Sequence, residues 1–168
     1  YEWHVVDASN GYSDSVVQSG NATSLLGSVY FDRDDQVYVV VTPFDGTDDG
    51  SPLSSNTVTV DNSVPSTPGV SIGPATPYEG VDPLICSVIS PASDIDNDSV
   101  QYLYEWFDAG LNLVQSTGPT SALSDTVSGS NTTGGIWTCE VTSFDGTDYG
   151  GGSSVTVDVD NGGPCSLA

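Results

Sequence analysis

The chain has 168 residues, and its 23 acidic residues face one basic residue and one histidine, for a formal net charge of −22. So negative a chain is repelled by nucleic acid and by anionic membrane surfaces, which excludes both as partners. No apolar run approaches the length of a membrane-spanning helix, so we expect no insertion by this segment. The length suits one large or two ordinary domains.

Aspartate dominates the acidic residues, since only four of the 23 are glutamate, which leaves 19 aspartates. Aspartate favours turns and supplies hard oxygen ligands for Ca²⁺. Bound divalent cations would also relieve the self-repulsion of so acidic a chain. The alternative is a salt-rich habitat, in which acidic surfaces are common.

Apolar and polar residues alternate along much of the chain, between clusters of Gly, Pro, Asn, Asp and Ser. This pattern predicts an all-β fold without helices. In the first part of the chain, we expect strands at 1–6, 22–30, 36–43 and 54–60. In the second part, we expect them at 69–73, 82–89, 100–107, 111–116, 121–127, 135–143 and 153–159.

Two cysteines and a tryptophan mark the centre of the second part. Cys86 and Cys139 both occupy inward positions of predicted strands, and Trp106 lies on the strand between them. This is the immunoglobulin pattern, in which a disulfide joins two sheets and the indole packs on it. The alternative is a pair of unpaired buried thiols in a cytosolic domain. Trp137 occupies the tyrosine-corner position, so the domain departs from antibody domains in detail.

The sequence repeats itself with a period of roughly 100 residues, the size of one immunoglobulin-like domain. Residues 1–3 match 104–106, and residues 41–50 match 141–150. We therefore predict tandem immunoglobulin-like β-sandwiches, of which the first is incomplete at its N-terminus. The predicted parts are a partial domain at 1–61, a complete domain at 62–161, and a linker or further repeat beginning at 162–168.

The first copy begins at its third strand, so it lacks two strands of a sandwich. Either a longer chain precedes Tyr1, or another molecule donates the missing strands. Val39 replaces the counterpart of Cys139, which predicts no disulfide in the first copy. Cys165 then has no obvious partner.

Carboxylates gather in the loops that precede and follow the predicted strands of the second copy. The loop 93–99 carries aspartates at alternate positions, and the loop 145–148 lies at the same end of an immunoglobulin sandwich. The linker from the first copy brings another aspartate to that end. Ca²⁺ takes six to eight oxygen ligands, and the carboxylates of these three segments could supply them. We therefore expect Ca²⁺ to bind at this junction and to stiffen it. The expected ligands are Asp61, Asp94, Asp96, Asp98, Asp145 and Asp148. The alternative is that these are solvated turn residues.

Other site predictions concern sugars and catalysis. Asn21 and Asn131 begin N-glycosylation triplets and lie in matching loop regions of the two copies. The single histidine, His4, and the absence of lysine leave no usual nucleophile–base pair, so we expect no enzyme.

The run from Asp94 to Trp106, followed by residues 137–141 and 144–148, resembles the tandem immunoglobulin-like and cadherin-like repeats of large microbial surface proteins. The resemblance implies an extracellular or cell-surface location and a stalk, adhesin or filament subunit, often stiffened by calcium. We therefore expect a non-catalytic structural module that associates with itself or with neighbouring repeats. A longer array of repeats is the favoured arrangement, and donation of strands between subunits is the alternative route. The alternative is an adhesin that binds glycans or another surface partner.

Overall fold

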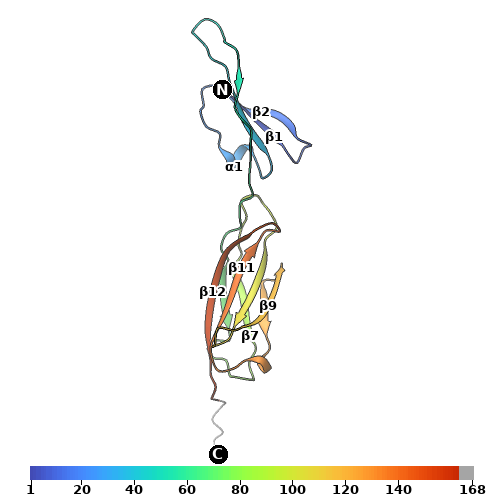
Figure 1. Ribbon diagram of the computed structural model, residues 1–168. Coiled ribbons are helices and arrows are strands. Elements are labelled where there is room, and N and C mark those ends of the chain that lie inside the picture. Colours follow the sequence, from blue (N-terminus) through green and yellow to red (C-terminus); the bar gives the residue numbers. More distant parts are fainter. Residues whose placement is uncertain (163–168) are drawn as a thin grey trace, which may run out of the picture. The chain divides into compact units, whose positions relative to one another are not determined.

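The computed structural model describes residues 1–162, apart from the side chain of Ser28. The chain divides into two compact units, a first unit at Tyr1–Ser63 and a second unit that begins at Val64 (Figure 1). Cys165 and the rest of the predicted further repeat lie outside the described residues. Within residues 1–162, no helix is long and apolar enough to span a membrane.

Two antiparallel sheets form the second unit, with β11 and β12 drawn in front of β7 in Figure 1. One sheet has the order β10-β7-β6, from Ser124–Val127, Leu84–Ser90 and Gly69–Gly73. The other has the order β12-β11-β8-β9, from Tyr149–Val159, Gly135–Phe144, Gln101–Phe107 and Leu113–Thr120. A short 3₁₀ helix at Gly129–Asn131 precedes β11. The prediction of an all-β sandwich is confirmed.

The core of the second unit lies between these sheets and follows from the alternation of their strands. Leu84 and Cys86 on β7 face Trp106 on β8 and Cys139 on β11, and all four are fully buried. The Trp106 Nε1 donates a hydrogen bond to the Asp125 carboxylate at 2.8 Å, so the buried indole nitrogen is satisfied. The apolar face of each sheet is thereby covered by the other.

One strand pairs differently from the constant-type immunoglobulin arrangement, in which the fourth strand joins the sheet of the first two. Here β9 pairs with β8, and β10 pairs with β7. The sheet that contains β8 therefore gains a fourth strand, while the sheet that contains β7 keeps three.

The first unit has a single sheet among the described residues, in the order β2-β1-β3-β4, with β5 also paired to β3. These strands are Ser13–Ser19, Glu2–Asp7, Gln36–Val41, Leu53–Ser54 and Val58–Thr59. The register places Trp3 opposite Val39, as Trp106 lies opposite Cys139 in the second unit. A four-residue helix, α1, occupies Gly27–Tyr30.

The strand predicted at 22–30 is wrong, because residues 22–26 are irregular and α1 follows them. The matching strand of the second unit, β10, obtains its backbone hydrogen bonds from β7. No counterpart of β7 is present among the described residues of the first unit, so a strand at 22–30 would leave its backbone groups unpaired. The strand predicted at 54–60 is divided into β4 and β5, and β2 was missed, because its polar start obscures the alternation.

Candidate functional site

The predicted disulfide between Cys86 and Cys139 is confirmed. It connects β7 to β11, and therefore one sheet to the other, with the two Cα atoms 6.4 Å apart. Trp106 lies directly opposite Cys139 in the ladder between β8 and β11. The second unit thus has a covalent cross-link through the middle of its core.

The indole of Trp137 performs the task of a tyrosine corner. Its Nε1 donates to the carbonyl oxygen of Thr133 at 2.8 Å, a backbone group four residues upstream. A corner tyrosine makes the equivalent hydrogen bond to the backbone with its hydroxyl. The departure noted in the sequence therefore preserves the anchoring of the chain where it enters β11.

The two acidic loops of the second unit do emerge at the same end of its sheet. The register places Phe144, the last residue of β11, opposite Gln101, the first residue of β8. The loop that holds Asp94, Asp96 and Asp98 precedes Gln101, and the loop that holds Asp145 and Asp148 follows Phe144.

Asp145 uses one carboxylate oxygen to close its own loop. Its Oδ1 accepts hydrogen bonds from the backbone N–H groups of Thr147 and Asp148, both at 2.7 Å. Asp45 makes the same pair of bonds in the first unit, to Thr47 at 2.9 Å and Asp48 at 3.0 Å. These N–H groups, that of Asp48 foremost, hold the pKa of Asp45 below its ordinary value. A turn-forming role therefore accounts for one oxygen of each side chain.

Asp94 offers the clearest observation in favour of a cation. Its Oδ1 accepts a hydrogen bond from the backbone N–H of Asp96 at 2.7 Å, whereas its Oδ2 is buried and has no hydrogen-bond partner among the described residues. A buried, unsatisfied carboxylate oxygen is costly unless a cation or water meets it. Asp94 therefore fits one position of a metal site.

The whole set of predicted ligands does not assemble into a metal site. Within residues 1–162, no three side chains of the His, Cys, Asp and Glu types come close enough together to hold a metal ion. Asp61 belongs to the first unit, where it is exposed. The calcium site stays a prediction that rests on Asp94 and on the shared end of the two loops.

Both predicted glycosylation sites are accessible. Asn21 lies in the irregular segment after β2, Asn131 ends the 3₁₀ helix, and both residues are exposed. Accessibility is required for modification, but glycosylation itself stays a prediction.

Sequence reasoning missed a polar cluster on the outer face of the first unit. The Tyr38 hydroxyl donates to Oδ2 of Asp14 at 2.6 Å, and Nδ1 of His4 lies 3.1 Å from the other carboxylate oxygen. The rings of His4 and Tyr38 stack with their centroids 4.5 Å apart. The hydrogen bond from Tyr38 is the main reason that the pKa of Asp14 lies below its ordinary value, and it raises the pKa of Tyr38. The cluster could be predicted only if the position of β2, the strand that carries Asp14, were known.

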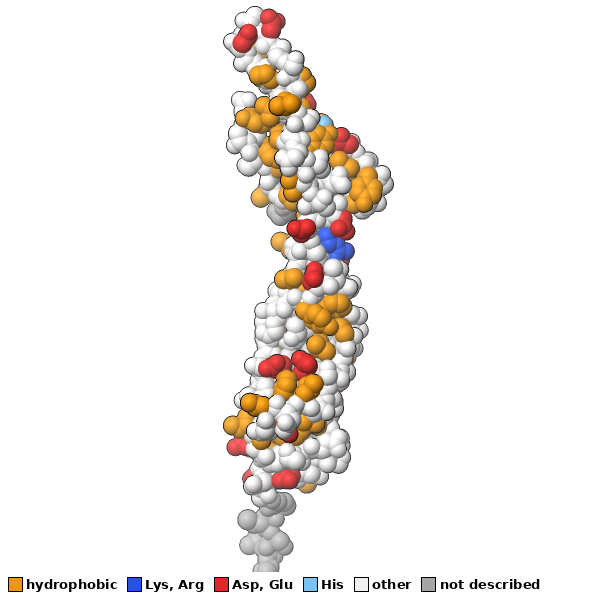
Figure 2. Space-filling model, viewed as in Figure 1, with side chains coloured by type: hydrophobic (Ala, Val, Ile, Leu, Met, Phe, Trp, Pro, Cys, Tyr) orange, Lys and Arg blue, Asp and Glu red, His pale blue; other side chains and the backbone are white. Residues whose placement is uncertain are grey.

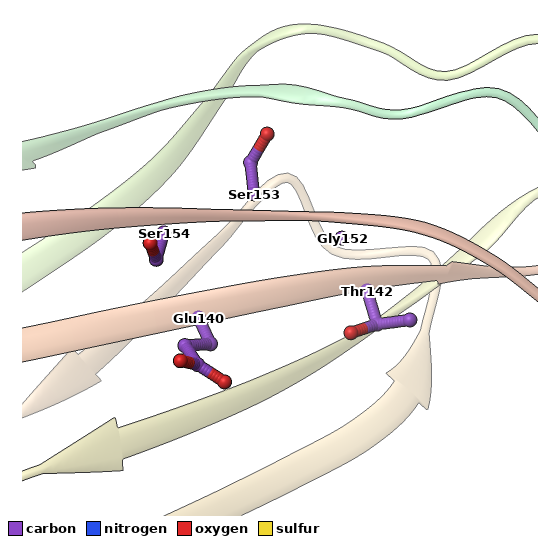
Figure 3. Close-up of a pocket in the computed structure, with 5 residues that line it drawn as sticks. All are labelled: Glu140, Thr142, Gly152, Ser153 and Ser154. Atoms are coloured by element: carbon purple, nitrogen blue, oxygen red, sulfur yellow. The ribbon is translucent and has the colours of Figure 1, made fainter.

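A shallow polar pocket lies on the second unit between β11 and β12 (Figure 3). Glu140 and Thr142 point away from the side on which Ser153 lies, and Ser154 and Gly152 complete the lining. Its volume of about 240 Å³ is below the ~300–1,000 Å³ typical of small-molecule sites. The pocket can accept hydrogen bonds from a small polar group but cannot enclose a larger ligand.

No protein-family model and no curated protein matches the sequence. Solved structures do match. The chain is similar to domains d3–d4 of the rat CD45 extracellular region, with a TM-score of 0.53 and 12% identity over 88% of this chain and 76% of that one. It is also similar to the FN1–FN3 domains of chicken CNTN1, with a TM-score of 0.46 and 12% identity over 96% of this chain and 58% of that one. The likeness to the CD45 domains shows a shared β-sandwich fold.

Proposed function

We propose that the chain is a non-catalytic structural module of an extracellular stalk or filament, built from tandem immunoglobulin-like units that Ca²⁺ stiffens. The observation that carries the proposal is the second unit, whose buried core is crossed by the Cys86–Cys139 disulfide. A disulfide of this kind is typical of proteins exposed to an oxidising environment. The extracellular source of the similar CD45 domains supports the same location.

A structural role is also supported by how the chain uses its reactive side chains. The single histidine, His4, stacks on Tyr38 and lies beside Asp14 on a sheet surface. The carboxylates of Asp45 and Asp145 close turns. These groups have structural partners, which favours a module that bears load or presents a surface.

Calcium is proposed to act where the two acidic loops of the second unit leave its sheet. The buried Oδ2 of Asp94 supports this, together with the presence of Asp96 and Asp98 in the same loop. A cation that binds only the folded state raises the stability of that state in proportion to the logarithm of its concentration. We expect millimolar Ca²⁺ to raise the melting temperature of the second unit.

Calorimetric titration with Ca²⁺ and a thermal melt test this step. The variant Asp94→Asn should lose both the heat of binding and the rise in melting temperature. The control is Asp158→Asn, which removes an exposed aspartate from β12 and should leave both unchanged. If the unaltered chain shows neither signal, the calcium part of the proposal fails.

Assembly is proposed to occur with neighbouring repeats or with other subunits, including by donation of strands to the first unit. Electron microscopy of the native material should show fibres or a thin stalk in which sandwich units repeat. Scattered single particles that stay monomeric at high concentration would contradict a filament.

A second candidate is an adhesin that binds glycans, and the polar pocket in Figure 3 favours it. The carboxylate of Glu140 and the hydroxyl of Thr142 could accept and donate hydrogen bonds to a single sugar unit. Binding of this chain to a glycan array, abolished by Glu140→Gln, would favour the adhesin over the structural module.

A further inference from the structure

The inner face of the first unit's sheet carries an apolar pocket. The pocket has a volume of about 590 Å³. Its lining contains no charged side chain and includes Trp3, Leu25, Phe31, Val37 and Val39. Figure 2 shows hydrophobic side chains gathered on the first unit of a chain whose net charge is −22. An uncharged, apolar surface of this kind on so acidic a protein is typical of an interaction site.

Both units contain a Trp–Gln pair that holds a neighbouring segment, and this pair shows which part of the second unit corresponds to the pocket. Trp3 lies opposite Gln18, as Trp106 lies opposite Gln115. In the second unit, the side-chain nitrogens of Trp106 and Gln115 both donate to β10 residue Asp125, at 2.8 and 2.7 Å.

In the first unit, the same two kinds of side chain hold the segment 22–24. The indole nitrogen of Trp3 donates to the carbonyl oxygen of Ala22 at 3.1 Å, and Gln18 donates to that of Ser24 at 3.2 Å. This segment follows β2 and precedes β3, as β10 lies between β9 and β11. The irregular segment 22–26 therefore occupies the position of β10 but pairs with no strand among the described residues.

The second unit shows which strands pair with β10 and cover the inner face of the sheet. There, β10 pairs with β7 in the register Ser124↔Ser87, and β7 pairs with β6. Neither β6 nor β7 contains a charged residue, and Leu84, Cys86 and Val88 project from β7 into the core. This strand pair covers the inner face of β8 and β11 by packing sheet against sheet.

We propose that the apolar face of the first unit binds a partner that presents two adjacent antiparallel strands, uncharged and with branched aliphatic side chains at alternate positions, as β6 and β7 do. The partner packs its apolar face on Trp3, Val37 and Val39. One of its strands pairs with residues 22–26, which become a β-strand. Binding is thus mainly by face-to-face packing, and the strand pairing at 22–26 sets the register.

A second copy of this chain is the poorer occupant. Each copy carries a net charge of −22, so two copies without bound cations repel one another. The strands β6 and β7 of each copy are also held within their own sandwich by β10 and by the Cys86–Cys139 disulfide. The inference deepens the proposed function by naming the surface at which strands are donated, but its test needs neither calcium nor a filament, so the two can fail separately.

The test repeats residues 64–103 directly before Tyr1, so that Leu103 of the added segment precedes the match of Tyr104. Cys165→Ser removes the third cysteine, and Val39→Cys places a thiol where the second unit has Cys139. After oxidative folding, we expect the cysteine at position 39 to form a disulfide with the added copy of Cys86, and to resist alkylation measured by mass spectrometry. The control, Val40→Cys, has its side chain on the opposite face and should stay reactive.

Hydrogen exchange gives an independent measure of whether the added strands pair with residues 22–26. The amides of residues 22–26 should exchange much more slowly in the protein with the added segment than in the unaltered chain, because they enter a ladder. Equal alkylation of the cysteines at positions 39 and 40, or unchanged exchange at 22–26, would overturn the inference. Disulfide-linked dimers formed through position 39, but not through position 40, in the chain without the added segment would show a second copy to be the occupant, and would also overturn it.

Discussion

The two units carry the same sheet in two different surroundings. In the second unit, the inner face of β8 and β11 is covered by β6, β7 and β10, and Trp106 is fully buried. In the first unit, β1 and β3 repeat the register with Trp3 opposite Val39, yet Trp3, Val37 and Val39 line an open pocket. The comparison shows that the strands of one sheet can pair with one another without the opposite sheet. A fully buried core, in contrast, requires the opposite sheet.

The largest expected effect concerns the two equivalent tryptophans. Trp106→Ala should destabilise the second unit by about 3–5 kcal/mol, because it empties a filled core. Trp3→Ala should cost the first unit much less, because its indole is only partly buried. Urea unfolding, followed by the NMR signals of Val88 for the second unit and Val5 for the first, measures both. Equal losses from the two substitutions would contradict the difference in cover.

The next effect concerns the cross-link that only the second unit has among the described residues. Replacing both cysteines, by Cys86→Ala and Cys139→Val, opens a loop with a sequence separation of 53 residues and should cost the second unit about 2–4 kcal/mol. Valine at position 139 copies Val39, so the change makes the second unit resemble the first. The same urea experiment should show the Val5 signals of the first unit unchanged, and a shift in both units would show that the two do not unfold separately.

The polar cluster on the outer face gives the first unit a pH-dependent contribution to stability that rests on Asp14. Because folding holds the pKa of Asp14 below its ordinary value of 3.8, its contribution to stability is present above pH 3.8 and is lost as the pH falls through the lower, folded value. The urea midpoint of the Val5 signals should therefore fall between about pH 5 and pH 2. Asp14→Asn should flatten this part of the fall, and a variant with the same profile as the unaltered chain would exclude this role of the carboxylate.

The smallest effect concerns a matched pair of outer-face positions. Glu105 lies directly opposite Glu140 in the second unit, whereas the equivalent pair in the first unit is Glu2 and Val40. Like charges in this position are destabilising, so Glu140→Val should stabilise the second unit by roughly 0.2–1 kcal/mol. The reverse change, Val40→Glu, should destabilise the first unit by a similar amount. Added salt should shrink both effects, and gains that persist at high salt would point to packing rather than charge.

The sequence was sufficient to predict the positions of strands whose inward-facing residues are buried. Residues 69–73 and 135–143 were predicted almost as they occur, because their alternation reflects two filled layers of one core. It failed at 22–30, because strand propensity there is not matched by a neighbour that could take the hydrogen bonds. The pairing of Cys86 with Cys139 was predictable from inward positions on opposite sheets.

The candidate site was less predictable than the fold, because it depends on how single side chains are oriented. The shared end of the two acidic loops follows from strand order, and the register of Phe144 with Gln101 agrees with it. The turn-closing hydrogen bonds of Asp145 and the buried oxygen of Asp94 depend on local backbone geometry that composition does not reveal. The contact of Asp14 with Tyr38 needed the register of β2, whose polar start hid the strand.

Hydrogen exchange of the unaltered chain tests the contrast between the two units most directly, since protection reports how firmly each strand is covered. The amides of Thr138, Cys139 and Val141 on β11 should exchange only through global unfolding of the second unit. Those of Tyr38, Val39 and Val41 on β3 should exchange far faster, through local opening of a sheet whose inner face is only partly covered by the described residues. Equal protection of β3 and β11 would contradict the account, because it would mean that the first unit's sheet is as well covered as the second's.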